Sequence, residues 1–407
     1  MAKDLQRVLG FWDSVAIGIA AMIGAGIFVV SGIGTRIAGS AVILAFIIAG
    51  IVALFNAFSS AELASAIPRE GGTYEYARRL LSPKVGFITG WFFVSSKMLE
   101  SATIALAFGA YVSLVLNIEP RIFGVVAVLA LTMINAAGIR TSTDASKIMA
   151  VIKVGVLAAF ALFGLSAIKP THFVPFASGG LQGVLTASAI IFFAYTGYAR
   201  IATLGEEVKE PRKTIPKAIL VSLVITIIVY VSVVTVGIGL VGVQKFGSSN
   251  SPIAAAAAVL GGPWVALVIF GAGVATLSVL LSDLFSSSRT VFAMARNGDF
   301  PKVLSEMRDM NPVNSVIATS AVVLALVLTG SLVQVAALTS LTILIYYAVT
   351  NLSALRLQPE KKLYPKIIPI AGLISCLGLL VFLPVQQWIW TGLLLAAGLV
   401  YMIIRKI

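Results

Sequence analysis

Three basic residues lie inside long apolar stretches of the chain, where charge is costly: Lys97, Lys153 and Arg200. A charged side chain at bilayer depth costs on the order of 3 kcal/mol or more, so each of them needs a partner, a wet cavity or a function. The chemistry open to such residues is the neutralisation of a nearby carboxylate or the uptake and release of a proton.

Lys153 is the most informative of the three. It stands one turn into its apolar stretch, and no acidic residue lies three or four positions away on either side. Burial disfavours the charged form of an amine, so a lysine in such a place can exchange a proton near neutral pH. A proton-coupled carrier needs this behaviour. The alternative is a lysine whose long side chain snorkels to the inner interface.

Glu100 follows Lys97 by three residues, which places both side chains on one face of a helix. The simplest interpretation is mutual neutralisation, and contact of the pair with a substrate is the alternative. For Arg200 we expect a structural role, because a long side chain near the end of an apolar stretch can reach water.

Two of the apolar stretches are interrupted by glycine near their midpoints, at Ile23-Gly24-Ala25-Gly26-Ile27-Phe28 and at Phe193-Ala194-Tyr195-Thr196-Gly197. Glycine costs about 1 kcal/mol in a helix interior, and irregular backbone at bilayer depth survives only when it is buried in protein or lines a cavity. Matching interruptions in two halves of a chain indicate a secondary transporter with its binding site near the midplane. Close packing of helices at small residues is the structural alternative.

The elements that position these residues are membrane spans. Of the 407 residues, 59% are hydrophobic and 11% are charged, and the mean hydropathy is +1.03. A soluble chain of this size needs more polar surface. Apolar runs of bilayer-crossing length predict twelve spans in an all-α integral membrane protein: Trp12–Ile37, Ala41–Ala66, Val85–Leu116, Ile122–Ala137, Ile148–Ile168, Leu181–Ala202, Ile215–Val243, Pro263–Phe285, Ser315–Thr329, Leu332–Ala354, Ile367–Leu383 and Trp388–Ile404.

The positive charges predict the orientation in the membrane. With a cytoplasmic amino terminus, the even-numbered loops and both tails collect most of the basic residues, and only Arg36, Arg121, Lys169 and Lys245 fall outside. We therefore expect both termini on the inner side of the cell membrane. The net charge of +13 reports this orientation, and we expect lipid rather than nucleic acid as the partner of the basic surface.

Enzymatic and metal chemistry have little basis in this sequence. Cys376 is the only cysteine and His172 the only histidine, and neither has other metal ligands at a suitable spacing. Asp13, Glu62 and Asp283 lie near the predicted inner ends of spans, where gating or packing pairs with Arg and Lys are the expected use. No pair of acids is spaced for general acid and base catalysis. We expect no enzyme, no metal, no cofactor and no cleavable signal segment.

Four motifs in order along the chain resemble those of the amino acid/polyamine/organocation transporter family. The first is the interruption at residues 23–28. The others run from Glu62 to Tyr74, from Phe192 to Pro216, and over Ala295-Arg296-Asn297-Gly298-Asp299-Phe300-Pro301. The resemblance implies the leucine-transporter type of fold, with a first repeat over residues 11–168, an inverted second repeat over 181–355 and two added helices in 365–407. The whole chain then forms one transmembrane domain in which spans one and six are unwound at mid-span.

The resemblance also implies where a small amino acid or amine is bound. The α-carboxylate meets the amides of Gly24, Ala25 and Gly26, since helix amino termini attract anions. The α-amino group meets carbonyls of Ile23 and of the second interruption. Phe193 matches an aromatic gate. Apart from the resemblance, we also expect Glu100 to take part in gating. The full predicted set of substrate-binding positions is Ile23, Gly24, Ala25, Gly26, Ile27, Phe192, Phe193, Ala194, Tyr195, Gly197, Ser96, Lys97 and Ser101.

For the coupling ion, Lys153 matches a lysine that takes the place of sodium in some proton-coupled relatives, and Ser278 matches a nearby hydroxyl. The sequence therefore predicts a proton-coupled amino-acid symporter that works by alternating access. A proton-independent amino-acid or polyamine exchanger is the closest alternative, and a nutrient receptor that binds without transport is the remoter one. The pair Lys97 and Glu100 has no counterpart in the family pattern. The substrate side chain and the oligomeric state, monomer or homodimer, stay open.

Overall fold

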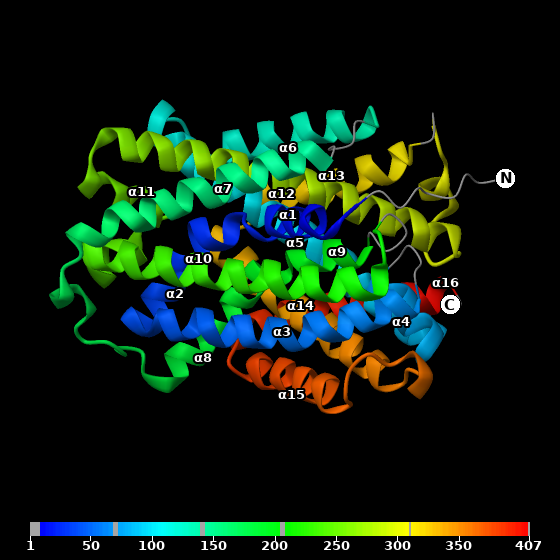
Figure 1. Ribbon diagram of the computed structural model, residues 1–407. Coiled ribbons are helices and arrows are strands. Elements are labelled where there is room, and N and C mark those ends of the chain that lie inside the picture. Colours follow the sequence, from blue (N-terminus) through cyan, green and yellow to red (C-terminus); the bar gives the residue numbers. More distant parts are fainter. Residues whose placement is uncertain (1–8, 68–71, 139–142, 204–207, 309–310, 406–407) are drawn as a thin grey trace.

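A computed structural model describes residues 9–67, 72–138, 143–203, 208–308 and 311–405. These residues form a bundle of roughly aligned helices with no β-strand among them (Figure 1). α1 begins and α16 ends at the same end of the bundle. The motif residues 68–71 and 204–207 lie outside the described part.

The first half of the chain carries the helices that precede the second interruption. Proline and cap residues set several of the boundaries: α5 starts at Pro83, where the Ser82 hydroxyl accepts from the amide of Val85 at 3.2 Å, and stops at Asn117 in the left-handed region. The elements are α1 Phe11–Met22, η1 Gly26–Val30, α2 Ser31–Ala38, η2 Gly39–Ala41, α3 Val42–Ala66, α4 Gly72–Leu80, α5 Pro83–Leu116, α6 Pro120–Ala136, α7 Thr143–Gly164, η3 Leu165–Ala167 and η4 Pro170–Phe173.

The second half repeats the pattern of long apolar helices joined by short connections. α10 bends at Gly242, whose φ of 79° is accessible to glycine. The elements are α8 Gly180–Ile191, η5 Phe192–Tyr198, α9 Ala199–Thr203, α10 Pro211–Ser248, α11 Pro252–Ala257, η6 Ala258–Leu260, α12 Gly262–Arg296, η7 Lys302–Ser305, α13 Val313–Thr329, α14 Leu332–Leu355, η8 Pro359–Lys361, α15 Ile367–Val381 and α16 Val385–Arg405.

Eight helical segments of the described chain are long and apolar enough to cross a membrane, and helix occupies much of every predicted span. Four shorter apolar helices are Phe11–Met22, Pro120–Ala136, Val313–Thr329 and Ile367–Val381. The narrow predicted boundary at Gly330-Ser331 is confirmed, because α13 ends at Thr329 and α14 begins at Leu332. Large apolar side chains are exposed along the outer helices, as expected where lipid is the solvent. The chain is a multi-pass membrane protein.

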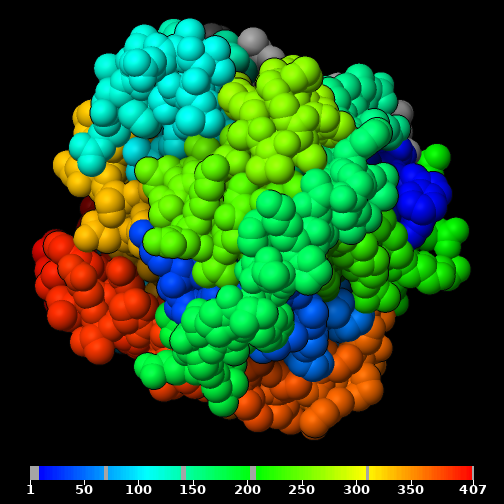
Figure 2. Space-filling model, turned by 90° about the vertical axis from the view of Figure 1, so that its left-hand side faces the viewer, coloured from blue at the N-terminus to red at the C-terminus, as the bar shows by residue number. Residues whose placement is uncertain are grey.

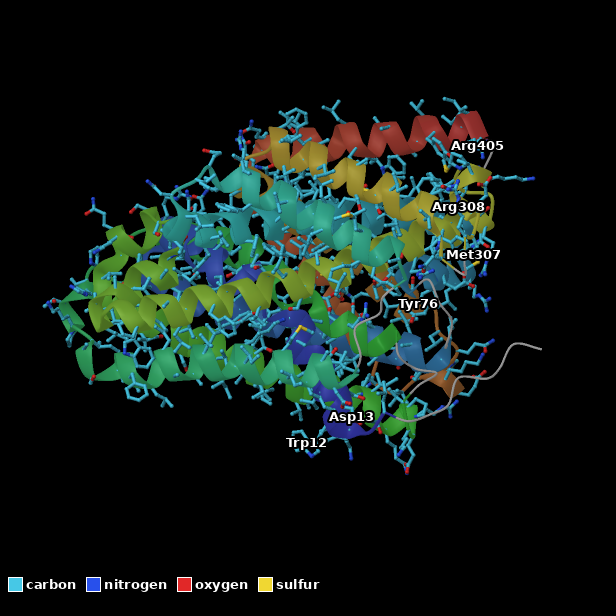
Figure 3. All side chains as sticks on the ribbon, turned by 90° about the horizontal axis from the view of Figure 1, so that it is seen from above. Trp12, Asp13, Tyr76, Met307, Arg308 and Arg405 are labelled. Carbon is cyan, nitrogen blue, oxygen red and sulfur yellow. The ribbon has the colours of Figure 1, made fainter. Side chains whose placement is uncertain are left out.

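α5 lies at the centre of the bundle and packs against α12, α14 and α6. α16 lies at the opposite edge from Trp12 and Asp13 of α1 (Figure 3). Only 17% of its most apolar 18-residue stretch is buried inside the protein. Figure 2 shows the end of the bundle that lies opposite the end of α16. Residues 165–180 and the connection from α10 to α12 cover much of the surface there. The middle part of α5, together with η5 and the end of α1, lies in the interior of the molecule.

The second and fourth motifs meet where α4 packs on the end of α12. The Tyr74 hydroxyl donates to Asp299 at 2.5 Å, and Asn297 donates to the same hydroxyl at 2.9 Å. Arg78 forms an ion pair with Asp299 at 2.9 Å. Burial, reinforced by the bond to Asp299, raises the pKa of Tyr74 to about 12, so its hydroxyl keeps the proton that it donates.

Candidate functional site

The first interruption is a true break in the helix. α1 ends at Met22, Ile23 adopts φ −77° and ψ 98°, and the chain becomes helical again with the π-helical turn η1 from Gly26. The last carbonyls of α1 and the first amides of η1 cannot all find partners within their own helices. Backbone N–H donors and C=O acceptors without helical partners therefore lie close together inside the bundle, as the sequence predicted.

The second interruption differs in kind. Residues Phe192–Tyr198 form a 3₁₀ helix, and the flanking residues Ile191 and Ala199 stay in the right-handed helical region. The expectation of an unwound segment here needs correction, because the chain is wound more tightly rather than opened. The physical reason is that i to i+3 hydrogen bonds still pair most backbone groups, which an apolar interior requires.

The glycines allow the two interrupted segments to touch. A Cβ atom on Gly26 would lie 2.3 Å from the Cβ and 2.7 Å from the Cα of Ala194. A Cβ atom on Gly197 would lie 2.4 Å from the carbonyl carbon and oxygen of Ala21. These glycines therefore serve close packing, the structural alternative, as well as the break in the first segment. The contact is between main chains, which places backbone groups of both segments around one space.

A small cavity lies at this contact. Its wall comes from both interrupted segments and from α5 and α12: Ala21, Met22, Gly24, Ala25, Gly26, Glu100, Ile104, Phe193, Ala194, Gly197 and Val279. In this conformation the free space holds about one water molecule, so an amino acid can bind only when the wall residues move apart. Main-chain atoms and one carboxylate supply most of its polar character.

The structure brings about half of the predicted substrate-binding positions to this wall. Those on it are Gly24, Ala25, Gly26, Phe193, Ala194 and Gly197, joined by the predicted gating residue Glu100. The others are buried but are not part of the wall: Ile23, Ile27, Phe192, Tyr195, Ser96, Lys97 and Ser101.

Several of these other residues have structural partners instead. The Ser96 hydroxyl donates to Phe93 of its own helix at 2.7 Å, and the Tyr195 hydroxyl donates to the carbonyl of Phe46 at 3.0 Å. The ring of Phe192 meets that of Tyr347 edge to face, with centroids 5.9 Å apart. Periodicity alone does not distinguish a side chain facing the cavity from one facing a neighbouring helix.

Lys153 is fully buried on α7, and its side-chain nitrogen donates to the carbonyl oxygen of Ala20 at 2.5 Å. This carbonyl belongs to the last turn of α1, next to the break, where helix carbonyls lack intrahelical partners and carry negative partial charge. The side chain does not snorkel to the surface. The predicted partner Ser278 donates to Ala275 of its own helix at 3.0 Å.

Sequence reasoning missed Tyr230 on α10. Its hydroxyl is 2.8 Å from the carbonyl oxygen of Met22 and 3.2 Å from that of Ala194, so one side chain reaches both interrupted segments. The ring is fully buried against Tyr195, with centroids 5.2 Å apart. A lone tyrosine in an apolar span gave no signal in the sequence, because its partners are main-chain atoms distant along the chain.

The pair Lys97 and Glu100 forms as predicted, with the nitrogen 2.6 Å from the carboxylate oxygen. Asp283 of α12 joins it at 3.2 Å from the same nitrogen. The other predicted acids also have partners: Asp13 pairs with Lys147 at 2.5 Å, and Glu62 accepts from the amides at 363 and 364. The described residues contain no group of three or more His, Cys, Asp or Glu that could hold a metal ion.

The model of the amino acid permease family matches residues 13–407, nearly the whole chain. The chain belongs to the amino acid permease family. The resemblance drawn from the four motifs is thereby confirmed, and this permease is a transporter rather than an enzyme.

Relatives of the permease cover most of its length. An uncharacterized transporter of Mycobacterium tuberculosis is 37% identical over 99% of this chain and 92% of its own. The branched-chain amino acid permease BcaP of Bacillus subtilis is 32% identical over 75% of this chain and 70% of its own. A methylthioribose transporter of the same species is 28% identical over 100% of this chain and 95% of its own.

Proposed function

We propose that this permease carries small neutral amino acids across the cell membrane by proton-coupled symport, with Lys153 as the proton carrier. The observation that carries the proposal is the position of Lys153, buried and bonded to Ala20 one turn from the cavity that both interrupted segments line. Membership of the amino acid permease family supports the substrate class.

The cavity suits a zwitterion. The amino end of η1 at Gly26 offers amides and positive partial charge to a carboxylate. The carboxyl end of α1, at Ala21 and Met22, and the carboxylate of Glu100 offer acceptors to an ammonium group. Gly24 packs directly against Val279, so a substrate side chain is accommodated only when these two wall residues separate. Relatives named branched-chain amino acid permease BcaP support neutral amino acids as the substrate class.

In this proposal, the bond between Lys153 and Ala20 couples proton binding to substrate transport. A protonated amine makes a stronger, charge-assisted bond to a carbonyl than a neutral amine does. Loss of the proton weakens the attachment of α1 to α7, and α1 carries part of the cavity wall. The position of α1 and the proton on Lys153 thus depend on each other, which is the linkage that symport requires.

In this proposal the chain crosses the membrane twelve times, with both termini cytoplasmic and with residues 11–168 and 181–355 as inverted repeats. The eight long apolar helices and four shorter ones in the described part of the chain support it, as does the shared end for the start of α1 and the end of α16. Alternating access then consists of movement of the interrupted helices relative to α5 and α12 around the cavity.

The test is uptake into proteoliposomes. A thermal-shift screen of the purified permease with the twenty amino acids, common polyamines and methylthioribose first identifies a ligand, since ligands stabilise the state that they bind. Radiolabelled uptake of that ligand is then measured with and without an imposed inward proton gradient. We expect accumulation only with the gradient, and collapse of accumulation when a protonophore is added.

Each other outcome contradicts a part of the proposal. Equal uptake with and without the gradient, together with exchange against internal substrate, makes the permease a proton-independent exchanger. Stabilisation by polyamines or methylthioribose alone overturns the substrate class. Binding without uptake or exchange makes the chain a receptor.

A further inference from the structure

We propose that Asp283 is a second proton-binding residue of this permease, linked to the substrate cavity through Lys97 and Glu100. The proposal rests on the proposed function for its transport consequence, but its structural part stands on the arrangement of these three side chains. All three are more than nine-tenths buried, at 8%, 6% and 5% exposure for Lys97, Glu100 and Asp283.

The cluster has one cation for two carboxyl groups. Two carboxylates that share a buried site cannot both ionise without a large cost, because desolvation and mutual repulsion both oppose the second charge. One proton bound to either carboxyl group removes the excess negative charge.

The distances identify Asp283 as the protonated partner. The nitrogen of Lys97 lies 2.6 Å from Glu100, the length of a charge-assisted bond, but 3.2 Å from Asp283. The second oxygen of Asp283, Oδ2, is buried and makes no hydrogen bond within the described part of the chain. An unpaired charged oxygen is far costlier to bury than an unpaired neutral hydroxyl.

Other polar groups around the cluster do not replace the proton. Arg200 on α9 acts electrostatically on Asp283, but it is partly exposed and its guanidinium lies over Phe285, 5.8 Å from the ring centroid. From α14, Tyr346 and Tyr347 face the cluster as neutral phenols, with Tyr198 of η5 beyond them.

The cluster reaches the substrate through Glu100, which lines the cavity. A substrate ammonium group beside Glu100 competes with Lys97 for the carboxylate. Lys97 is then free to move toward Asp283, and an ammonium group closer to Asp283 favours its ionised form and the release of its proton. Substrate and proton are therefore linked at this site independently of Lys153.

Infrared difference spectroscopy of the reconstituted permease between acidic and alkaline pH tests the proton directly. We expect a band from a buried protonated carboxyl group in the wild type, which shifts when aspartate is labelled with ¹³C at its side-chain carboxyl carbon, and we expect its loss in Asp283→Asn. Glu100→Gln should lose the band as well, because Lys97 is then free to pair with an ionised Asp283. Asp299→Asn is the matched control, because Asp299 is also buried but is paired with Arg78 at 2.9 Å, so the band persists. Addition of L-leucine or L-alanine should diminish the band in the wild type.

Two outcomes overturn the proposal: a band that survives in Asp283→Asn, or one that disappears when sodium replaces choline, which makes the site one for a metal cation. Asn mimics the neutral acid, so we expect Asp283→Asn to fold, and a sharp size-exclusion peak checks this. Flux-reversal measurements should give one more inward proton per amino acid in Asp283→Asn, because a proton that is released when substrate binds moves in exchange for the substrate. An unchanged ratio overturns the link to transport. Failure of wild-type exchange would contradict the proposed function alone, since the band does not depend on transport.

Discussion

Lys153 and Ala20 are joined by a hydrogen bond of 2.5 Å from the side-chain nitrogen of α7 to a main-chain oxygen of α1. The bond attaches a titratable group to the helix that ends at the cavity. Removal of the amine should therefore separate proton coupling from substrate binding.

We expect Lys153→Ala to lose gradient-driven accumulation by at least tenfold while it keeps exchange of internal for external substrate, because exchange moves no net proton. Parallel uptake and exchange assays in proteoliposomes measure this. Lys169→Ala is the control, since Lys169 is exposed in the connection after η3. Accumulation at the wild-type level by Lys153→Ala would show that another group carries the proton.

Gly26→Ala should block binding at the cavity. The new Cβ atom would lie 2.3 Å from that of Ala194, and relief of such overpacking costs about 1–3 kcal/mol. We expect a loss of substrate affinity of about 5- to 150-fold, since 1.36 kcal/mol corresponds to a factor of ten.

Titration calorimetry of the purified protein measures the affinity. Gly273→Ala on α12 is the matched control, because no atom lies within 4 Å of its added Cβ, and its affinity should equal that of the wild type. Tight binding by Gly26→Ala would mean that the two segments are not held in contact when substrate is bound.

Tyr230→Phe should loosen the contact between the interrupted segments. The substitution removes the hydroxyl shared by Met22 and Ala194 and preserves the packed ring. One lost hydrogen bond of this kind costs about 0.5–1.5 kcal/mol, so we expect a lower unfolding temperature and weaker substrate binding.

Tyr401→Phe on α16 serves for comparison, because that hydroxyl is buried without a hydrogen-bond partner in the described chain. Tyr230→Phe should have a lower unfolding temperature than Tyr401→Phe, and added ligand should stabilise it less. Identical behaviour of both variants would remove Tyr230 from the site.

Asp299→Asn should detach α4 from the end of α12. The substitution removes the negative charge that Arg78 and the hydroxyl of Tyr74 both contact. We expect a loss of stability of about 1.5–2 kcal/mol, the low end for bonds to charged groups, because Arg78 is partly exposed to solvent.

The unfolding temperature in detergent measures this loss. Asp144→Asn provides the control, since the Asp144 side chain is 87% exposed and its replacement should leave the temperature unchanged. The pKa of Tyr74, raised to about 12 by burial and by Asp299, should fall toward its ordinary value in Asp299→Asn. An ultraviolet titration of the tyrosinate that showed no such change would contradict this account of the contact.

The sequence by itself determined the membrane environment, the helical spans and their order, because apolar run length is a local property that a bilayer reads directly. It also determined the break at Gly24, the boundary at Gly330 and the pair of Lys97 with Glu100, since each depends on residues close together in the chain. Family membership followed from four short motifs in order.

Only the tertiary structure decided which buried side chains face the cavity. Asp283 joins Lys97 across 186 positions of sequence, and Tyr230 reaches Met22 across 208. Neither contact leaves a periodic pattern, because the partner in each case lies on another helix. The second interruption is a 3₁₀ helix whose i to i+3 hydrogen bonds pair its backbone, and its Gly197 allows the close approach to Ala21. The glycine alone did not distinguish a break from a close contact, because the partner segment lies far away along the chain.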